Sequence, residues 1–282
     1  MKKNIIVSLL FFTFTLNCFA IENGELRANF KTVSFDFSQT TVKNSDEYID
    51  SPYASLNSND ETIIKGTFDF ALELNKLNYR WDNKIFATYG KTTVKDHEDG
   101  TKTTSENADL ILLTSDYSRK MWRMRQADLG LFTSIQYQTE FTKNEDSPLN
   151  KIIRGMFGIK MFNGVRFSDL YFTNVVEDDL TYNDPITKYG LEIGTTVAYQ
   201  WKEDVKVRFE GYFRKYFMYS RYNPNDLEYD LNFKTNLDVN ITRILKLSPF
   251  ISVRQAKSRG AKDYARNVNF GVSILYSDLF VL

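Results

Sequence analysis

Residue types that support nucleophilic catalysis are scarce in this chain. Its only histidine, His97, stands in the acidic segment Asp96–Gly100. A serine hydrolase needs a histidine within reach of the serine and a third group that orients the imidazole, and the sequence around His97 places no such group on a strand. An Asp-x-His pair is also missing. We therefore expect no enzyme, no catalytic residue and no cofactor.

Carboxylates gather in two acidic segments, Asp96–Asp99 and Glu177–Asp179. Such oxygen clusters suit hard cations, but neither segment has the spacing of a calcium loop, and acidic loop tips are usually solvated. We assign no metal site. A divalent ion that bridges loops to lipopolysaccharide phosphates is left open.

Polar and apolar side chains alternate from Leu227 to Ile241, with apolar residues or Thr at odd positions and polar residues at even ones. This pattern predicts a strand of about fifteen residues with one apolar face. Strands of soluble sheets run about 5–6 residues, whereas a tilted strand that crosses lipid needs about 9–11. Since lipid offers backbone groups no hydrogen-bond partner, strands span it only as a closed barrel.

The fold class that this pattern predicts is all-β: an antiparallel transmembrane up-and-down β-barrel of about 12 strands with both termini periplasmic. Long polar connections follow the odd strands and tight turns follow the even ones, as in outer-membrane barrels, whose strand number is even. The expected strands cover residues 25–41, 62–81, 84–95, 109–122, 129–143, 151–163, 165–177, 189–202, 205–220, 227–242, 244–255 and 264–282.

The second expected strand changes its apolar parity, from Phe68–Leu74 at even positions to Leu77–Trp81 at odd ones. Either a bulge or the turn lies near residues 75–76. We favour the bulge, because residues 79–85 resemble 199–205 and suggest the same hairpin twice. The strands at 109–122 and 165–177 alternate poorly, and their faces stay unassigned.

The first twenty residues have the pattern of a secretory signal peptide, with a basic start at Lys2 and Lys3, an apolar stretch and the small residues Cys18 and Ala20 before the cleavage site. The expected organisation is a signal peptide at 1–20 and an outer-membrane β-barrel at 21–282. The expected location is the bacterial outer membrane.

Composition agrees with a barrel. The formal net charge is +0 and aromatic residues make up 15%, so no basic excess indicates nucleic acid as a partner. The three tryptophans fall near strand ends that point to the same side, and we expect an aromatic belt at the periplasmic interface formed by Trp81, Trp122 and Trp201.

The last strand contains Asn269, Gly271, Ile274 and Tyr276 in the order polar-x-Gly-x-x-apolar-x-apolar. This order resembles the signal by which the barrel-assembly machinery recognises its clients. Glycine would let another backbone approach closely. The expected partners are therefore outer-membrane lipid and the barrel-assembly machinery, while the oligomeric state is left open.

If apolar residues face outward, charged side chains of both signs line the lumen. They would form either a polar conduit with a basic wall facing an acidic one, or an ion-paired plug that fills the lumen. The expected lining residues are Arg154, Lys160, Glu192, Lys206, Arg208, Glu210, Arg214, Glu228, Asp230, Lys234, Asp238, Lys246 and Arg254.

The order of these pieces resembles an uncharacterised family of outer-membrane β-barrels known only as a domain of unknown function. The resemblance rests on Asn78–Asn83, Ala87–Lys91 and Leu227–Ile241 leading into Ile244–Val253. A second resemblance, in length and strand rhythm, is to the salt-induced outer-membrane protein family. Neither implies a catalytic residue.

The function expected from the sequence is a narrow, porin-like channel or passive transporter for small hydrophilic solutes. The alternative is a structural or surface-interaction barrel with a plugged lumen and displayed extracellular loops. Activity of the phospholipase or protease type is not expected.

Overall fold

The computed structural model describes residues 24–48, 51, 54–57, 61–95, 102–124, 126–142, 149–164, 167–181 and 184–282. The expected signal peptide at 1–20 and His97 lie outside these residues. The described elements are almost all strands. The exceptions are two single turns, η2 (Ser45–Tyr48) and α2 (Ala54–Asn57), in the connection between the first two strands. Among the described residues, no helix is long and apolar enough to cross a membrane.

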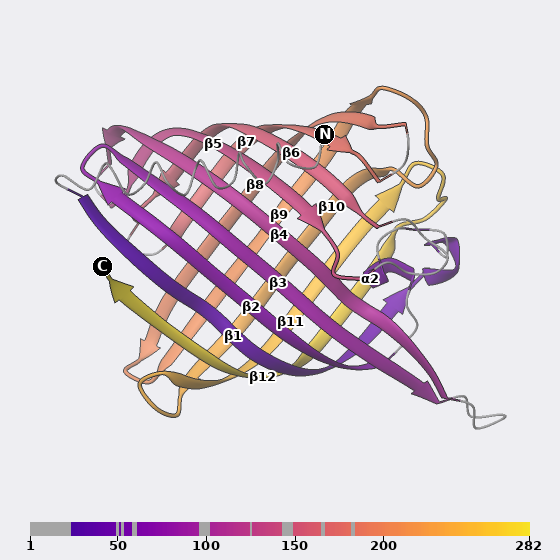
Figure 1. Cartoon of the computed structure of the whole chain (residues 1–282), viewed down its shortest axis with the longest axis horizontal. Helices are drawn as coiled ribbons and strands as arrows, with labels where there is room; N and C mark the ends of the chain where they lie inside the picture. Colours follow the sequence, from indigo (N-terminus) through magenta and orange to yellow (C-terminus); the bar gives the residue numbers. More distant parts are fainter. Residues whose placement is uncertain are drawn as a thin grey trace.

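Twelve antiparallel strands form a closed barrel in which each strand pairs with its sequence neighbours and the first pairs with the last. The predicted all-β antiparallel barrel of twelve strands is therefore confirmed (Figure 1), while the periplasmic position of the termini stays a prediction. The strands are β1 (Gly24–Lys43), β2 (Glu61–Lys76), β3 (Tyr79–Lys95), β4 (Lys102–Arg123), β5 (Asp128–Thr139), β6 (Lys151–Phe162), β7 (Phe167–Asp179), β8 (Ile186–Lys202), β9 (Val205–Tyr219), β10 (Leu227–Asn240), β11 (Leu245–Ser258) and β12 (Ala265–Val281).

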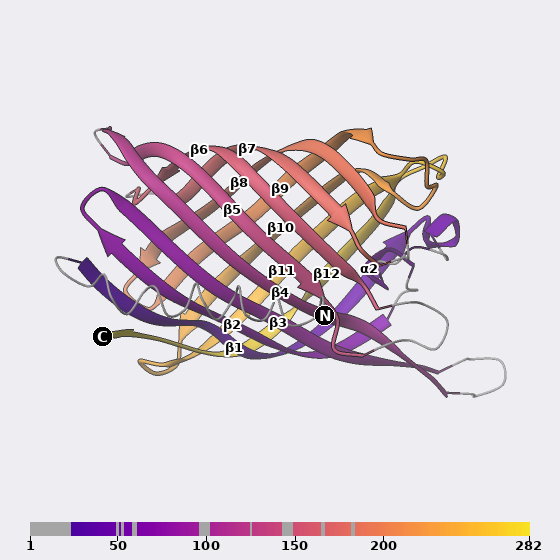
Figure 2. The same cartoon turned by 45° about the horizontal axis from the view of Figure 1, so that its top comes forward.

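The two ends of the barrel differ in the length of their connections. Every connection after an odd strand has at least six residues, and every one after an even strand has four or fewer. We call these the loop end and the turn end. Both ends of the described chain lie at the turn end, where the N–H of Leu282 donates to the carbonyl of Leu26 at 2.9 Å. Figure 2 shows α2 at the opposite end of the barrel from the C-terminus.

The barrel has its polar side chains inside and its apolar side chains outside, as β1 illustrates. Its even positions from Ser34 to Thr40 are buried and polar, including Asp36 at 1% exposure, whereas Phe35 between them is 66% exposed. Successive side chains of a strand point to opposite faces, and large apolar side chains are likewise exposed on the outer face of most of the other strands. Such an exterior suits hydrocarbon, and the closed ladder leaves no strand edge unpaired.

The predicted bulge near residues 75–76 is wrong. The turn lies there instead, at Leu77 and Asn78, and Asn75 pairs with Arg80. A two-residue turn restarts the alternation in the next strand, which explains the change of parity without an inserted residue. The similarity of residues 79–85 to 199–205 therefore reflects no shared hairpin, because the second turn follows Trp201 and Lys202.

The outward face can be tested by introducing a charge near the middle of β1. We expect Phe35→Arg to lower the free energy of unfolding in lipid vesicles by about 2–4 kcal/mol. Thr196→Arg is the matched control, because Thr196 faces the lumen beside its cross-strand neighbour Glu210. Urea titration followed by tryptophan fluorescence measures both. Equal losses at the two positions would contradict the assignment of faces.

Candidate functional site: the barrel lumen

The lumen contains twelve of the thirteen charged residues that the sequence placed there. Arg154, Lys160, Glu192, Arg214, Asp230 and Asp238 are buried, and Glu210 is exposed to solvent inside the barrel. The other five, all partly exposed, are Lys206, Arg208, Lys234, Lys246 and Arg254.

Glu228 is the exception, and its placement in the lumen is wrong. The pairing of β10 with β11 shifts between Leu227 and Tyr229, so the alternation slips at this point. As a result Leu227, expected outside, is 3% exposed inside the barrel. The Glu228 carboxylate lies instead 3.9 Å from the ammonium of Lys257, whose sequence neighbours Ala256 and Ser258 face inward.

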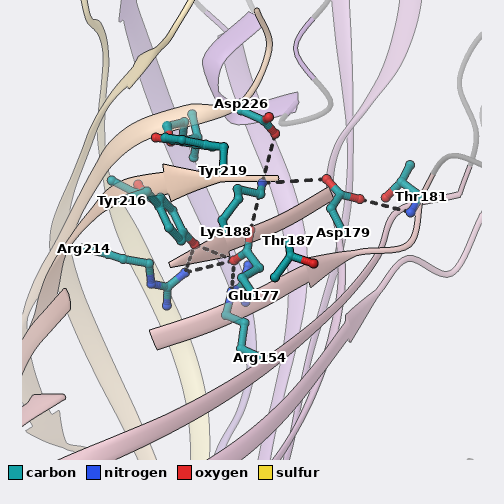
Figure 3. Close-up of polar contacts among 12 residues, drawn as sticks. Arg154, Glu177, Asp179, Thr181, Thr187, Lys188, Arg214, Tyr216, Tyr219 and Asp226 are labelled. Atoms are coloured by element: carbon teal, nitrogen blue, oxygen red, sulfur yellow. Dashed lines mark hydrogen bonds and ion pairs between the residues drawn. The ribbon is translucent and has the colours of Figure 1, made fainter. Parts of the chain in front are cut away.

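A cluster of charged residues closes the lumen near the loop end, centred on Glu177 of β7 (Figure 3). Arg154 donates to its carboxylate from β6. Lys188 Nζ lies 2.9 Å away on β8, and the Tyr216 hydroxyl of β9 donates at 2.5 Å. We call Arg154, Glu177, Lys188, Arg214 and Tyr216 the Glu177 cluster. Four adjacent strands thus meet at one carboxylate.

Lys188 is surrounded by carboxylates on several sides. Besides Glu177, Asp226 lies 3.2 Å and Asp179 3.9 Å from its ammonium. Burial raises the pKa of the Asp226 carboxyl, and the attraction of Lys188 offsets this only in part. The expectation that residues 177–179 form a solvated acidic segment was therefore wrong for Glu177, which is 1% exposed and fully ion-paired.

Further ion pairs extend this closure across β8 to β11. Arg214 donates to Glu192 at 2.5 Å, and the Tyr171 hydroxyl donates to the same carboxylate at 2.6 Å. Arg254 forms two hydrogen bonds of 3.0 Å with Asp230. A bidentate pair of this kind fixes both side chains, so the lumen wall on this side is rigid as well as polar.

The connection between β1 and β2 covers the loop end from above. Tyr48 and Leu56 are buried there against Tyr216, Leu227 and two alanines of the wall, Ala256 and Ala265. Ser55 accepts a hydrogen bond from Arg254 at 2.7 Å through its hydroxyl and one from Asn267 at 2.8 Å through its carbonyl. Since α2 contacts both β4 and β12, this connection reaches across the mouth of the barrel.

A second group of ion pairs lies toward the turn end, on β3, β4, β6 and β7. Lys84 is 2.6 Å from Asp116, Arg80 is 2.7 Å from Asp82, and Lys160 is 3.2 Å from Asp169. Asp116 and Asp169 belong to β4 and β7, the strands whose faces the sequence left unassigned.

Apolar side chains inside the barrel explain why those faces were hard to assign. Phe132, Met156 and Val175 form a buried cluster with Tyr171 packed against it. These inward positions on β5, β6 and β7 are apolar, so the contrast between the two faces of β7 is lost. These packed side chains fill the part of the lumen that lies beside β5, β6 and β7.

A small cavity of about 40 Å³ lies in the middle of the lumen, with room for roughly three water molecules. Its charged lining residues are Asp69, Arg208, Glu210 and Lys234. Within the described part of the chain, Asp69, Glu210 and Lys234 form no ion pair within 4.0 Å. Arg208 lies 3.6 Å from Asp238, and its Nε is buried without a hydrogen-bond partner. We call these four residues the central charges.

Several charged side chains of the described lumen are more exposed toward the turn end than those of the Glu177 cluster. The side chains of Lys31, Lys84 and Arg208, on the turn-end side of the cavity or beside it, are 27%, 23% and 22% exposed. By contrast, those of Arg154, Glu177 and Lys188 near the loop end are 7%, 1% and 2% exposed. Within the described residues, the charged side chains of the lumen are thus most deeply buried in the Glu177 cluster near the loop end, and several toward the turn end are partly exposed.

Comparison with known proteins gives a match to one family, described as a protein of unknown function (DUF3078), over residues 54–144. The predicted resemblance to an uncharacterised family is confirmed over this segment. No curated protein matches the sequence. The resemblance to the salt-induced family stays a prediction.

Solved structures similar to this chain are outer-membrane barrels. Outer membrane phospholipase A from Escherichia coli is 12% identical over 86% of this chain and 90% of that chain, with a TM-score of 0.41. An outer membrane channel from Pseudomonas putida F1 is 10% identical over 91% and 97%, with a TM-score of 0.44. The toluene transporter TodX of P. putida is 9% identical over 94% and 91%, with a TM-score of 0.36.

The three tryptophans lie at the turn end of the barrel. Trp122 and Trp201 end β4 and β8 and are 62% and 61% exposed. Trp81 lies near the start of β3, not the end of β2 as expected, but the turn between these strands keeps it at the same end. Its indole N–H donates to Ser115 at 2.9 Å.

The residues of the expected assembly signal lie along the seam where β12 pairs with β1. Asn269 is buried on the inner face, and Ile274 is 46% exposed on the outer one. Tyr276 packs beside Phe30 of β1, with ring centroids 6.5 Å apart. A side chain at Gly271 would collide with the carbonyl of Phe37, so only glycine lets the two strands meet there.

No group of three or more histidine, cysteine, aspartate or glutamate side chains in the described ranges is placed to hold a metal ion. The carboxylates near the loop end surround Lys188 instead.

The Glu177 cluster gives a prediction about stability. We expect Glu177→Gln to lower the free energy of unfolding by about 3–5 kcal/mol, because buried cations lose their shared counter-charge. Asp184→Asn is the control: Asp184 is 84% exposed in its pair with Arg221, and exposed pairs contribute little. Urea unfolding of both variants measures the difference. A loss at Glu177 no larger than at Asp184 would contradict the role of the cluster.

Proposed function

We propose that this protein is a passive channel for small hydrophilic solutes in the bacterial outer membrane, closed at its loop end in the described state. The turn end would face the periplasm and the loop end the outside. The observation that carries this proposal is the set of central charges around a small wet cavity. In this proposal the channel acts without a cofactor or a catalytic step, and the solute moves down its gradient.

The exterior supports a membrane location. The strands have 12 to 22 residues, enough to cross a hydrocarbon layer at a tilt. The outer positions carry a continuous apolar band, for example Phe157, Ile193 and Phe270 at 58%, 48% and 53% exposure. A soluble protein rarely shows so large an exposed apolar surface.

The middle of the lumen favours a conduit over a permanent plug. A buried charge without a partner costs several kcal/mol, and the Glu177 cluster meets that requirement with direct ion pairs. Three of the central charges, Asp69, Glu210 and Lys234, form no such pair in the described part of the chain, so water must solvate them. A wall of hydrated charges of both signs is the lining expected for a path of small polar solutes.

The closure lies where it could be removed without breaking the barrel. Tyr48 and Leu56 belong to the connection between β1 and β2, not to the wall. Their displacement would leave the strand ladder intact. Beneath them, the side chains of the Glu177 cluster would still have to rearrange for a solute to pass.

The alternative is a structural or surface-interaction barrel whose lumen stays plugged. The tight packing of the Glu177 cluster and the small cavity favour it, because neither leaves a path to the loop end in the described state. Conductance measurements separate the two proposals.

Removing the cover should raise conductance. We expect Leu56→Ala to increase the frequency or size of open steps in planar bilayers relative to the wild type, because it weakens the apolar contact that holds the connection over the mouth. Tyr222→Ala is the control, since Tyr222 is 65% exposed at the same end and lies outside the cover. A wild type and a folded Leu56→Ala variant that are both silent at high protein load would favour the plugged barrel.

The central charges should set ion selectivity. We expect Arg208→Gln to shift the reversal potential in a salt gradient toward cation preference and Glu210→Gln to shift it toward anion preference. Lys151→Gln is the neutral control, because this exposed residue lies on the outer face of β6. Shifts of the same sign at Arg208 and Glu210, or none, would contradict a path past these residues.

A further inference from the structure

Cationic side chains form a row across five adjacent strands near the loop end. Lys43 of β1 pairs with Arg266 of β12, which pairs in turn with Gln255 of β11. Lys257, two residues further on β11, pairs with Tyr229 of β10, and Tyr229 pairs with Lys215 of β9. We call Lys43, Lys215, Lys257 and Arg266 the cationic row. It spans four strand spacings of about 4.8 Å, or roughly 20 Å.

The row lies on the outer face of the barrel. Arg266 stands between Ala265 and Asn267, which are 0% and 9% exposed on the inner face. Lys215 stands between the buried Arg214 and Tyr216. Since neighbouring side chains of a strand point to opposite faces, these cations point away from the lumen, and none of the ion pairs of the Glu177 cluster includes them.

The row marks the upper border of the apolar band. Two residues closer to the turn end, the outward positions on β12, β10 and β9 are apolar: Val268, Leu231 and Phe213. On β11 and β1 the apolar positions begin further on, at Val253 after Gln255 and at Phe37 after Thr41 and Gln39. If this band lies in hydrocarbon, the cations stand at the level of lipid head groups, where long basic side chains are favoured.

Aromatic rings hold part of this region in place. The Tyr264 ring centroid lies 5.3 Å from the guanidinium of Arg266 and 6.0 Å from the ammonium of Lys43. Just beyond the row, the guanidinium of Arg259 lies 4.2 Å and 4.6 Å from the ring centroids of Tyr219 and Tyr222. Such contacts orient the cations without neutralising them.

Among the described residues, Glu228 is the one acidic side chain that forms an ion pair with the row. Glu228 lies 3.9 Å from Lys257, and both side chains are partly exposed, so the pair is weak. At the same end of the barrel on β5 to β8, the outward residues include Thr139, Lys151, Asp178 and Thr187, with one cation and one acid. The positive charge is therefore confined to one side.

We propose that the cationic row binds the phosphate groups of lipopolysaccharide in the leaflet at the loop end. This rests on the proposed location and orientation in the outer membrane, but not on conductance. Lys and Arg are the side chains that bind phosphate, and a row about 20 Å wide engages more than one phosphate. Bis-phosphorylated lipid A presents such a pair next to acyl chains that the apolar band below can cover.

The test measures lipid binding to the folded barrel in detergent. The probes are bis-phosphorylated lipid A, the same lipid A without its phosphates, and phosphatidylglycerol, each titrated and followed by native mass spectrometry. The variant of the row carries Lys43→Gln, Lys215→Gln, Lys257→Gln and Arg266→Gln. A matched control removes four cations at the turn end with Lys76→Gln, Arg119→Gln, Lys202→Gln and Arg243→Gln. Heat-modifiable gel migration verifies that each protein is folded.

We expect the wild type and the turn-end control to prefer bis-phosphorylated lipid A over both other lipids. The variant of the row should lose that preference, with affinity reduced on the order of tenfold to a hundredfold. Equal binding of the phosphorylated and dephosphorylated lipid, phosphatidylglycerol bound as tightly as lipid A, or full binding by the folded variant would each overturn the proposal. A barrel that binds lipid A but never conducts would leave this proposal standing and reject the channel.

Discussion

One constraint governs this structure: the outer face of the sheet must be apolar, and its inner face must hold the polar and charged side chains. Within the apolar band, charged side chains point into the lumen, and a twelve-strand lumen is too narrow to hydrate all of them. Each charge must then find a counter-charge or a place with water. The Glu177 cluster and the pairs around Asp116 meet the first condition, and the central charges meet the second. The lumen divides into dry and wet parts for this reason.

Because of that division, the two ends of the lumen differ. The connection that holds Tyr48 and Leu56 covers the most deeply buried ion pairs, whereas Lys84 and Arg208 toward the turn end are partly exposed. A plug evenly distributed along the axis would show no such difference. The cover and the Glu177 cluster both lie near the loop end, apart from the central charges that would meet a solute.

The sequence predicted the architecture because long alternating strands and two kinds of connection are local patterns. It failed where the alternation was broken. The turn at Leu77 was taken for a bulge, and the real shift between Leu227 and Tyr229 moved Glu228 outside. The Glu177 cluster was missed because its central residue stands beside Asp178 and Asp179 at the end of a strand whose inward side includes Tyr171 and Val175. Which charged side chains pair with one another depends on how the strands come together when the barrel closes, and a local sequence pattern carries no information on this.

The seam between β1 and β12 has a consequence for biogenesis. Every other pairing joins strands that are neighbours in the chain, so eleven of the twelve ladders are hairpins, whereas Arg27 pairs with Val281 across nearly the whole sequence. Hairpins close with little loss of chain entropy, but this last contact has the highest contact order in the molecule. Until it forms, two sheet edges remain open to aggregation. A partner that held one edge until the other arrived would protect the nascent chain during this step.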